Sequence, residues 1–184
     1  HSDPARADRA VEQLSEVFRH TLRRSDSEWA ALDQELAFAA AYLDVEEARF
    51  GTRLRYTIEA DAASRRAHVP SMLVHTLVEN AVIHGVDPCC ECGTVTIRAA
   101  EEAGTLRLSV ADTGEGISVK KGTGVGLTNI RERLKTLYGP GARLVIEENA
   151  PRGVVATIEV PANHHGASRP ERKNSLVLRR ARRE

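Results

Sequence analysis

Two pairs of strands that follow one another directly are the feature of this 184-residue sequence that most constrains its fold. Alternating apolar residues predict strands over 94–99 and 106–110, with a turn near Gly104. A second pair is predicted over 144–146 and 154–160, around a Pro-Arg-Gly turn. Strands joined by a short turn pair antiparallel, whereas a parallel pair needs a long crossover. The sheet is therefore expected to be mixed or antiparallel, which excludes a doubly wound parallel sheet.

Helical spacing of apolar residues appears in four segments, over 5–24, 32–50, 70–85 and 127–137. The third segment opens on a proline, which suits the first turn of a helix. One more strand is predicted over 54–58. With helices and strands in this order, the helices are expected to cover one face of the sheet. The predicted fold class is α+β: a two-layer α/β sandwich with a mixed sheet, preceded by helical stem segments.

Composition and charge divide the sequence into three parts. Residues 1–51 are expected to form a helical stem, 52–161 the α/β domain, and 162–184 a basic, disordered tail. From Ala162 onward there are seven basic residues and two acidic ones. Over the whole sequence 26 basic residues balance 26 acidic ones, so net charge gives no indication of a nucleic-acid partner.

No apolar run approaches the about 20 residues that span a bilayer, so any membrane anchor is expected outside this sequence. The sequence begins without an initiator Met or an apolar signal segment, as a piece of a longer protein would. Cys89, Cys90 and Cys92 cannot form a disulfide framework, which favours a reducing cytoplasm. Zinc binding by these thiols with His84 or His75 is an alternative to free thiols, although their spacing matches no standard zinc pattern.

The helix expected over 70–85 carries the first group of candidate site residues. Thr76, Asn80 and His84 are four residues apart, so they share one helix face, and Glu79 adjoins them. An Asn amide oxygen is a suitable hard ligand for Mg²⁺, which binds few protein groups and takes phosphate oxygens as further ligands. Taken alone, Asn80 and Glu79 are better explained as residues of a solvated helix surface.

The second group is the sequence DTGEG, which runs from Asp112 to Gly116 directly after an apolar strand. A buried carboxylate at a strand end can accept a hydrogen bond from an adenine amine. Gly114 and Gly116 allow a sharp bend and a close approach of the backbone to a ring. The alternative explanation is an ordinary turn of Asp-x-Gly composition.

The third group is GTGVGL, in which Gly122, Gly124, Gly126 and Leu127 stand just before the fourth helix. Exposed backbone amides that lead into a helix N-terminus suit phosphate binding. Such a pattern alone is also common in flexible loops. It is neither a Walker loop, because the Gly-Lys-Ser/Thr ending is absent, nor a dinucleotide fingerprint, because it does not follow a first strand.

Together and in this order, the three groups resemble the ATP-binding (Bergerat) fold shared by DNA gyrase, histidine kinases and mismatch-repair ATPases. VENAVIHG resembles the N box of that fold, DTGEG its G1 box and GTGVGL its G2 box. Thr157 falls in the last strand, where the fold usually places a Thr near adenine. The resemblance covers about residues 53–161 and implies ATP and Mg²⁺ as cofactors.

A narrower resemblance is to the LytS/YehU type of sensor histidine kinase, carried by YLDVEEARFGTRL, VPSMLVHTLVENAVIHG and GLTNIRERLKTLYG. In that family a helix with a phosphoacceptor histidine precedes the segment that matches SDPARADRAVEQLSEVFRHTL. The sequence is expected to begin after that helix. Neither His1 nor His20 stands in the right context, so no phosphoacceptor is assigned here.

The resemblance implies a role for each candidate residue. Asn80 would hold Mg²⁺ and act in catalysis with Glu79, and Asp112 would bind adenine. The nucleotide would also contact the set His84, Gly114, Gly116, Gly122, Gly124, Gly126, Leu127 and Thr157.

Two residues depart from the patterns of related proteins. Ile83 stands where related kinases often have a Lys near the phosphates, and Thr76 stands where the ATP hydrolases of the fold carry a Glu that activates water. Lys120, Lys121 or Arg131 is expected to supply the missing positive charge. The missing Glu favours phosphoryl transfer to a protein histidine over hydrolysis.

The function expected from the resemblance is that of an enzyme, a protein histidine kinase of a bacterial two-component system. It would transfer the γ-phosphoryl group of ATP to a histidine outside this sequence, and a response regulator would then receive the group. A homodimer is expected for the full-length protein, with a cytoplasmic catalytic domain. The alternatives are an ATPase or anti-sigma type protein-serine kinase of the same fold, and a degenerate nucleotide-binding or docking module.

Overall fold

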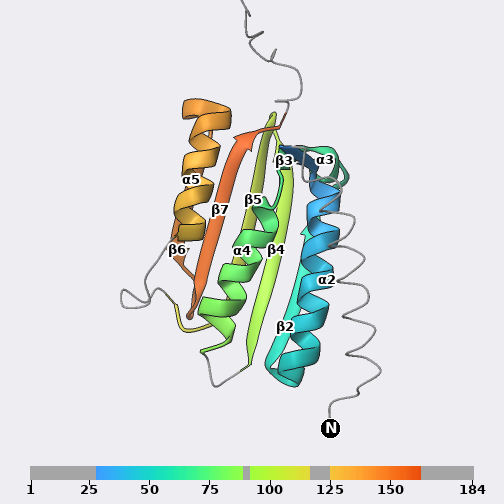
Figure 1. Ribbon diagram of the computed structural model, residues 1–184, viewed down its shortest axis with the longest axis vertical. Coiled ribbons are helices and arrows are strands. Elements are labelled where there is room, and N and C mark those ends of the chain that lie inside the picture. Colours follow the sequence, from blue (N-terminus) through green and yellow to red (C-terminus); the bar gives the residue numbers. More distant parts are fainter. Residues whose placement is uncertain (1–27, 89–91, 117–124, 163–184) are drawn as a thin grey trace, which may run out of the picture.

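The computed structural model describes residues 28–88, 92–116 and 125–162. One five-stranded sheet is covered on one face by helices, while its other face is open (Figure 1). The expected first helix, His1, His20 and the expected tail from residue 163 lie outside the described residues.

The sheet has the strand order β2-β4-β5-β7-β6. Its strands are β2 (Leu54–Ala60), β4 (Gly93–Glu102), β5 (Thr105–Asp112), β6 (Arg143–Glu148) and β7 (Val154–Pro161). The strands β2 and β4 pair parallel, and all other neighbours pair antiparallel. The predicted mixed sheet is confirmed, and both predicted hairpins are present as β4-β5 and β6-β7.

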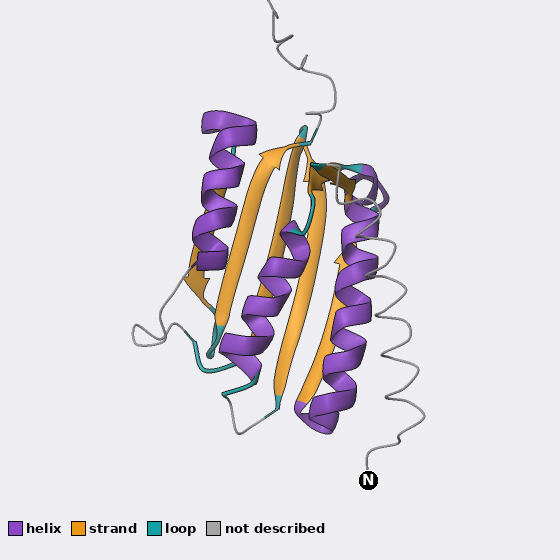
Figure 2. Cartoon of the chain, in the orientation of Figure 1, coloured by secondary structure: helices purple, strands orange, loops and turns teal. Residues whose placement is uncertain are grey.

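The helical layer and the connections complete the fold (Figure 2). The layer consists of α2 (Leu32–Phe50), α4 (Leu73–Asn80) with its π-helical extension η2 (Ala81–Val86), and α5 (Val125–Tyr138). The connections contain β1 (Trp29–Ala31), α3 (Ala62–Arg66), β3 (His68–Pro70) and the short helices η1 (Gly51–Arg53) and η3 (Gly139–Gly141). Within the described ranges, no helix combines the length and apolarity needed to cross a membrane.

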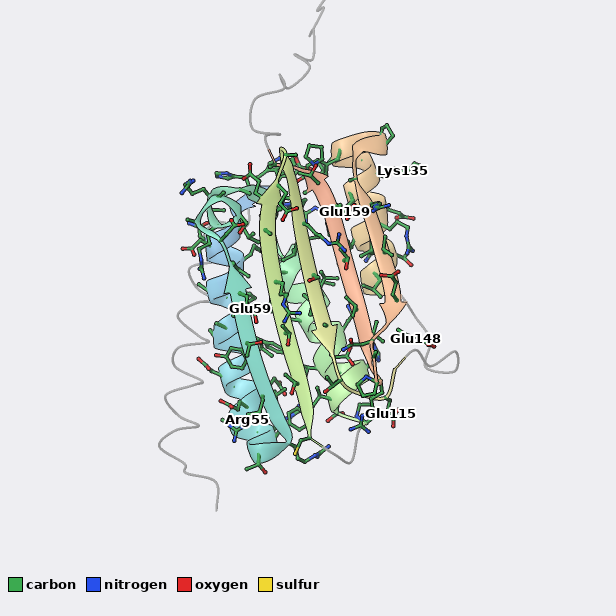
Figure 3. All side chains as sticks on the ribbon, turned by 180° about the vertical axis from the view of Figure 1, so that it is seen from behind. Arg55, Glu59, Glu115, Lys135, Glu148 and Glu159 are labelled. Atoms are coloured by element: carbon green, nitrogen blue, oxygen red, sulfur yellow. The ribbon has the colours of Figure 1, made fainter. Side chains whose placement is uncertain are left out.

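The two faces of the sheet differ in character because alternate residues of a strand point to opposite sides. Leu106, Leu108 and Val110 of β5 are buried beneath the helices, and the residues between them are polar or small. The open face carries ion pairs, including Arg98 Nε to Glu59 Oε2 at 2.8 Å (Figure 3). The core therefore lies between the sheet and the helical layer.

The helix α2 belongs to this sandwich. Leu32, Leu36, Ala39 and Leu43 are each at most 2% exposed and share one core cluster with the sheet residues. The expected division placed this helix in a stem that ends at residue 51. The core packing places α2 in the helical layer of the α/β domain. A helical stem before residue 28 stays a prediction.

The third predicted helix begins later than its proline indicates. Pro70 ends β3, which pairs with β1, and Met72 adopts a left-handed backbone with φ 66° before α4 begins at Leu73. The first turn of α4 has backbone N–H groups without helical partners. The buried carboxylate of Glu35 on α2 accepts hydrogen bonds from the N–H of Met72 at 2.8 Å and of Val74 at 3.1 Å. Glu35 thus caps α4 from a neighbouring helix.

We expect Glu35→Ala to lower the free energy of unfolding by about 1–3 kcal/mol, because it leaves the buried N–H of Val74 and the partly buried N–H of Met72 without acceptors. Chemical denaturation by urea measures this loss. The matched control is Asp33→Ala on the same helix, where the exposed pair with Arg65 should cost less than about 0.5 kcal/mol. Equal losses in the two variants would contradict the capping role of Glu35.

Candidate functional site

A cavity of about 150 Å³ lies between the helical layer and the end of the sheet where β5 finishes. Its walls come from α4 and η2, from the strands β5, β6 and β7, and from the start of α5. Most of the lining side chains are apolar. The lining residues are Leu77, Asn80, Ala81, His84, Gly85, Val110, Asp112, Gly116, Leu127, Ile146, Val154 and Ala156.

Asp112 is the buried carboxylate of this cavity, with 4% of its surface exposed. Its Oδ1 accepts a hydrogen bond from the Gly114 N–H at 2.9 Å, and its backbone carbonyl accepts one from Asn149 Nδ2 at 2.7 Å. Burial raises the pKa of the Asp112 carboxyl, and the backbone N–H groups of Gly114 and Val154 oppose this rise. The group is therefore a fixed acceptor at the wall of an apolar cavity.

Three glycines allow the backbone to close around Asp112. A Cβ on Gly85 would lie 2.5 Å from Asp112 Oδ1, and a Cβ on Gly114 would lie 2.0 Å from the Gly85 carbonyl oxygen. Gly153 has φ +107°, and a Cβ there would lie 2.0 Å from the Asp112 carbonyl oxygen. A side chain at Gly114 or Gly153 would displace backbone, and one at Gly85 would displace the Asp112 carboxylate.

Asn80 stands on the α4 side of the cavity. Its Nδ2 donates to the Thr76 carbonyl at 2.6 Å, which makes the amide oxygen the atom left for a ligand. The start of α5 approaches closely, because a Cβ on Gly126 would lie 3.2 Å from Thr76 Cγ2 and 3.3 Å from Asn80 Nδ2. Leu127, the next residue of α5, lines the cavity. The first turn of α5 thus meets the Asn80 end of α4.

The structure brings most of the described candidates together at this cavity. Asn80, His84, Asp112, Gly116 and Leu127 line it. The predicted Gly114 packs behind Asp112, and the predicted Gly126 packs against Asn80. The predicted lid glycines Gly122 and Gly124, with Lys120 and Lys121, lie outside the described residues, so their role stays a prediction.

Glu79 is placed elsewhere. It is exposed, it is absent from the cavity wall, and its charge acts on Tyr42 of α2 and on His75. The pKa of His75 is lowered by burial, while Glu79 opposes this effect. Since successive helix residues point about 100° apart, the neighbour of Asn80 faces α2. The structure therefore does not bring Glu79 to the site.

Thr157 is also placed away from the cavity wall, so its assignment to the nucleotide stays a prediction. It lies two residues before Glu159, whose side chain is on the open face of the sheet (Figure 3). Its β7 neighbour Ala156 faces the helices and lines the cavity together with Val154. Because side chains alternate between the two faces of a strand, Val154 and Ala156 line the cavity and Thr157 does not.

The apolar walls were not singled out from the sequence. Val110, Ala156 and Ile146 occupy neighbouring positions on β5, β7 and β6, as the strand register shows. One of these wall residues could have been found from the sequence: Val110 stands two residues before Asp112 and therefore shares its face of the strand. Residues on β6 and β7 could be added only after the register was known.

No cluster of three or more His, Cys, Asp or Glu side chains gathers in the described ranges. Cys92 is exposed and unpaired by disulfide, while Cys89 and Cys90 lie outside those ranges. The zinc alternative therefore gains no support from His75 or His84, whose positions are described.

We expect Gly114→Ala to lower the free energy of unfolding by about 1–3 kcal/mol or more, because its methyl group would overlap the Gly85 backbone. Gly141→Ala is the matched control: its Cβ would meet Pro161 Cγ at an ordinary 3.4 Å, so stability should hold or rise slightly. Thermal unfolding of both variants measures the difference. A Gly114→Ala variant as stable as Gly141→Ala would contradict the packing around Asp112.

Two family models match the chain. Residues 1–54 match the model described as histidine kinase. Residues 70–164 match the model described as histidine kinase-, DNA gyrase B- and HSP90-like ATPase, and this range includes every described cavity residue.

Curated relatives agree with these models. The sensor histidine kinase YpdA of Escherichia coli K12 is 35% identical over 152 residues, which are 77% of this chain and 27% of YpdA. The sensor protein LytS of Bacillus anthracis is 33% identical over 176 residues, which are 87% of this chain and 29% of LytS. The chain thus spans less than a third of the length of these relatives.

Solved structures share the fold. The histidine kinase domain of the blue-light activated kinase from Erythrobacter litoralis EL346 superposes with a TM-score of 0.59 at 21% identity, covering 83% of this chain and 75% of that one. The histidine kinase ThkA, in complex with the response regulator TrrA, gives a TM-score of 0.57 at 17% identity, covering 85% of this chain and 49% of that one. These likenesses establish the Bergerat-type fold. The chain therefore belongs to the histidine kinase-, DNA gyrase B- and HSP90-like ATPase family, and over most of its length it is similar to the sensor proteins YpdA and LytS.

Proposed function

We propose that this domain binds Mg²⁺-ATP in the cavity and transfers the γ-phosphoryl group to a histidine on the stem of its own kinase. The observation that carries the proposal is the pairing of a buried carboxylate, Asp112, with a helix-borne amide, Asn80, on the walls of one apolar cavity.

Adenine is assigned to the Asp112 end of the cavity. A carboxylate can accept a hydrogen bond from the exocyclic amine of adenine, and burial strengthens such a bond. The apolar side chains of Val110, Ala156 and Ile146 form walls suited to a planar ring. The hydrogen bond from Gly114 fixes one carboxylate oxygen, so the group is held in place before the ligand arrives.

The phosphates and Mg²⁺ are assigned to the Asn80 end. The donor chemistry fits, because Mg²⁺ takes oxygen ligands and keeps few protein groups when phosphates supply the rest. The Asn80 Nδ2 is bonded to the Thr76 carbonyl, so the amide presents its oxygen. When bound, the cation would neutralise charge on the transferred phosphoryl group. Gly122 and Gly124 are proposed to add backbone amides for the phosphates, with a positive charge from Lys120, Lys121 or Arg131.

Phosphoryl transfer is favoured over hydrolysis because the described cavity residues offer no second carboxylate that could activate a water molecule. Among the described lining residues Asp112 is the one acidic side chain, and it is assigned to adenine. Thr76, at the position of the water-activating Glu in hydrolases, donates its hydroxyl to the Met72 carbonyl at 2.8 Å. Glu79 faces α2. A neutral imidazole is already a nucleophile and needs no such base, so histidine is the acceptor that this site suits.

The proposed partner is a response regulator, which would accept the phosphoryl group from the histidine onto an aspartate. The support is the fold shared with ThkA, a histidine kinase crystallised with its response regulator. We further propose that the full-length protein is a homodimer, that this domain lies in the cytoplasm, and that a segment outside this chain contacts the membrane.

The reaction is tested with γ-labelled ATP and Mg²⁺ on a protein that also includes the stem with its phosphoacceptor histidine. Label on histidine, stable to alkali and lost in acid, is the expected result. Labelled free phosphate alone would support an ATPase and contradict the proposal. Nucleotide binding with neither product would support a degenerate docking module.

Asp112→Asn tests the adenine assignment. We expect the affinity for Mg²⁺-ATP to fall by at least about 10-fold, since a hydrogen bond to a charged group is lost or misdirected. Isothermal titration calorimetry measures the affinity. The matched control is Glu115→Gln, which removes the same charge from an exposed side chain three residues away (Figure 3). Equal affinities of Asp112→Asn and wild type would contradict the assignment.

The same carboxyl predicts a pH dependence. The pKa of Asp112 is raised by burial above its unfolded value of 3.8, so the unfolded chain loses its proton first as pH rises. The contribution of Asp112 to stability should therefore fall as pH rises from 3.8 through its folded pKa, and Asp112→Asn should be at least as stable as wild type at pH 7. Affinity for ATP should change the opposite way, because it requires the ionised form. Thermal unfolding and calorimetry across this acidic range measure both trends.

A further inference from the structure

Arg133 of α5 joins three segments that are far apart in the sequence. Its Nη1 donates to the Ser71 carbonyl just before α4, and its Nη2 donates to the Glu28 carbonyl at 2.9 Å. The same Glu28 carbonyl accepts the Ser71 N–H at 3.1 Å. We call these three residues the Arg133 joint. Glu28 is the first described residue, so the joint sits where residues 1–27 connect to the α/β domain.

A ring contact supports the joint from the other side. Trp29 of β1 packs edge-on against Tyr138 at the end of α5, with ring centroids 5.4 Å apart and an interplanar angle of 82°. The contact places β1 against α5 independently of Arg133. Trp29 is also the single tryptophan of the chain, so tryptophan fluorescence reports on the surroundings of this one side chain.

A ladder of hydrogen bonds runs from the joint along α4 to Asn80. Next to Ser71, Met72 donates its N–H to Glu35 at 2.8 Å, and its carbonyl accepts the Thr76 hydroxyl at 2.8 Å. The Thr76 carbonyl in turn accepts Asn80 Nδ2 at 2.6 Å. The position of the Asn80 amide therefore depends on the first turn of α4, which the joint holds.

The helix α5 contacts both the Asn80 end of α4 and the chain just before α4. Gly126 and Arg133 are seven residues apart, so they share one face of α5. Gly126 packs against Asn80 and Thr76, whereas Arg133 reaches Ser71 at the opposite end of α4 (Figure 1). A shift of the first turn of α5 would therefore be transmitted both to Asn80 and to the chain at Glu28.

We propose that Arg133 is a positioning residue of the nucleotide site, which couples the Asn80 end of the cavity to the segment that enters the domain at Glu28. This inference rests on the proposed nucleotide function of the cavity. Arginine is suited to the role because its planar fork offers several donors and reaches two carbonyls at once. Lysine keeps the charge but presents one nitrogen, so it cannot hold both segments in the same geometry.

The test compares wild type with Arg133→Lys, Arg133→Ala and the control Lys135→Ala, an exposed residue of the same helix (Figure 3). Calorimetry gives the affinity for Mg²⁺-ATP, Trp29 emission reports the state of the joint, and urea unfolding gives the stability. We expect wild-type Trp29 emission to change with the same midpoint as calorimetric binding. Both Arg133 variants should lose this change and bind roughly 2- to 30-fold more weakly, whereas Lys135→Ala should keep both properties.

The outcomes separate this inference from the function on which it rests. If wild type binds nucleotide without a change in Trp29 emission, or if folded Arg133→Lys keeps wild-type affinity and emission response, the coupling is wrong and the nucleotide function stands. If wild type binds no nucleotide, the proposed function fails and the coupling fails with it. A purely structural role for Arg133 would lower the unfolding free energy of the variants while their emission response to nucleotide stayed intact, which also contradicts the coupling.

Discussion

The burial of one carboxylate is the constraint on which the site depends. An ionised or ionisable group beneath an apolar cavity is costly unless backbone N–H groups surround it, and such close backbone approach requires glycine. Asp112 meets this condition through the N–H groups of Gly114 and Val154. Gly85, Gly114 and Gly153, from three separate segments of the chain, leave the space for this close packing. The glycines therefore allow close packing around a hydrogen-bond acceptor. This acceptor marks one end of a mostly apolar cavity. The same burial that makes the carboxylate useful for recognition makes it a weak point for stability.

The Asn80 end of the site depends on contacts that hold α4 at both of its ends. At its beginning, Glu35 and the Arg133 joint satisfy groups of the first turn, and at its end the close approach of Gly126 fixes the surroundings of Asn80. Both supports come from other helices of the layer, α2 and α5. Besides its buried apolar face, α2 thus contributes the acceptor for the first turn of the helix that carries Asn80.

Much of this arrangement was predictable from the sequence, and the limits have physical causes. The mixed sheet followed from consecutive strands with short turns, and Asn80 and Asp112, two candidates from the sequence, lie on the walls of one cavity. Thr157 lies away from the cavity that its neighbour Ala156 lines, because a strand alternates faces with period two. Glu79 lies away from the cavity that its neighbour Asn80 lines, because successive helix residues point about 100° apart. Glu35, Gly153 and Arg133 act across long sequence separations, which local patterns do not report.

The central claim is that one cavity binds both ends of a Mg²⁺-nucleotide, with adenine at Asp112 and the metal at Asn80. The most direct measurement is a crystal structure of the domain with Mg²⁺ and a non-hydrolysable ATP analogue. The account predicts the exocyclic amine of adenine within hydrogen-bond distance of the Asp112 carboxylate and the Asn80 Oδ1 among the ligands of the metal. A nucleotide bound outside this cavity, or one whose adenine lies away from Asp112, would contradict it.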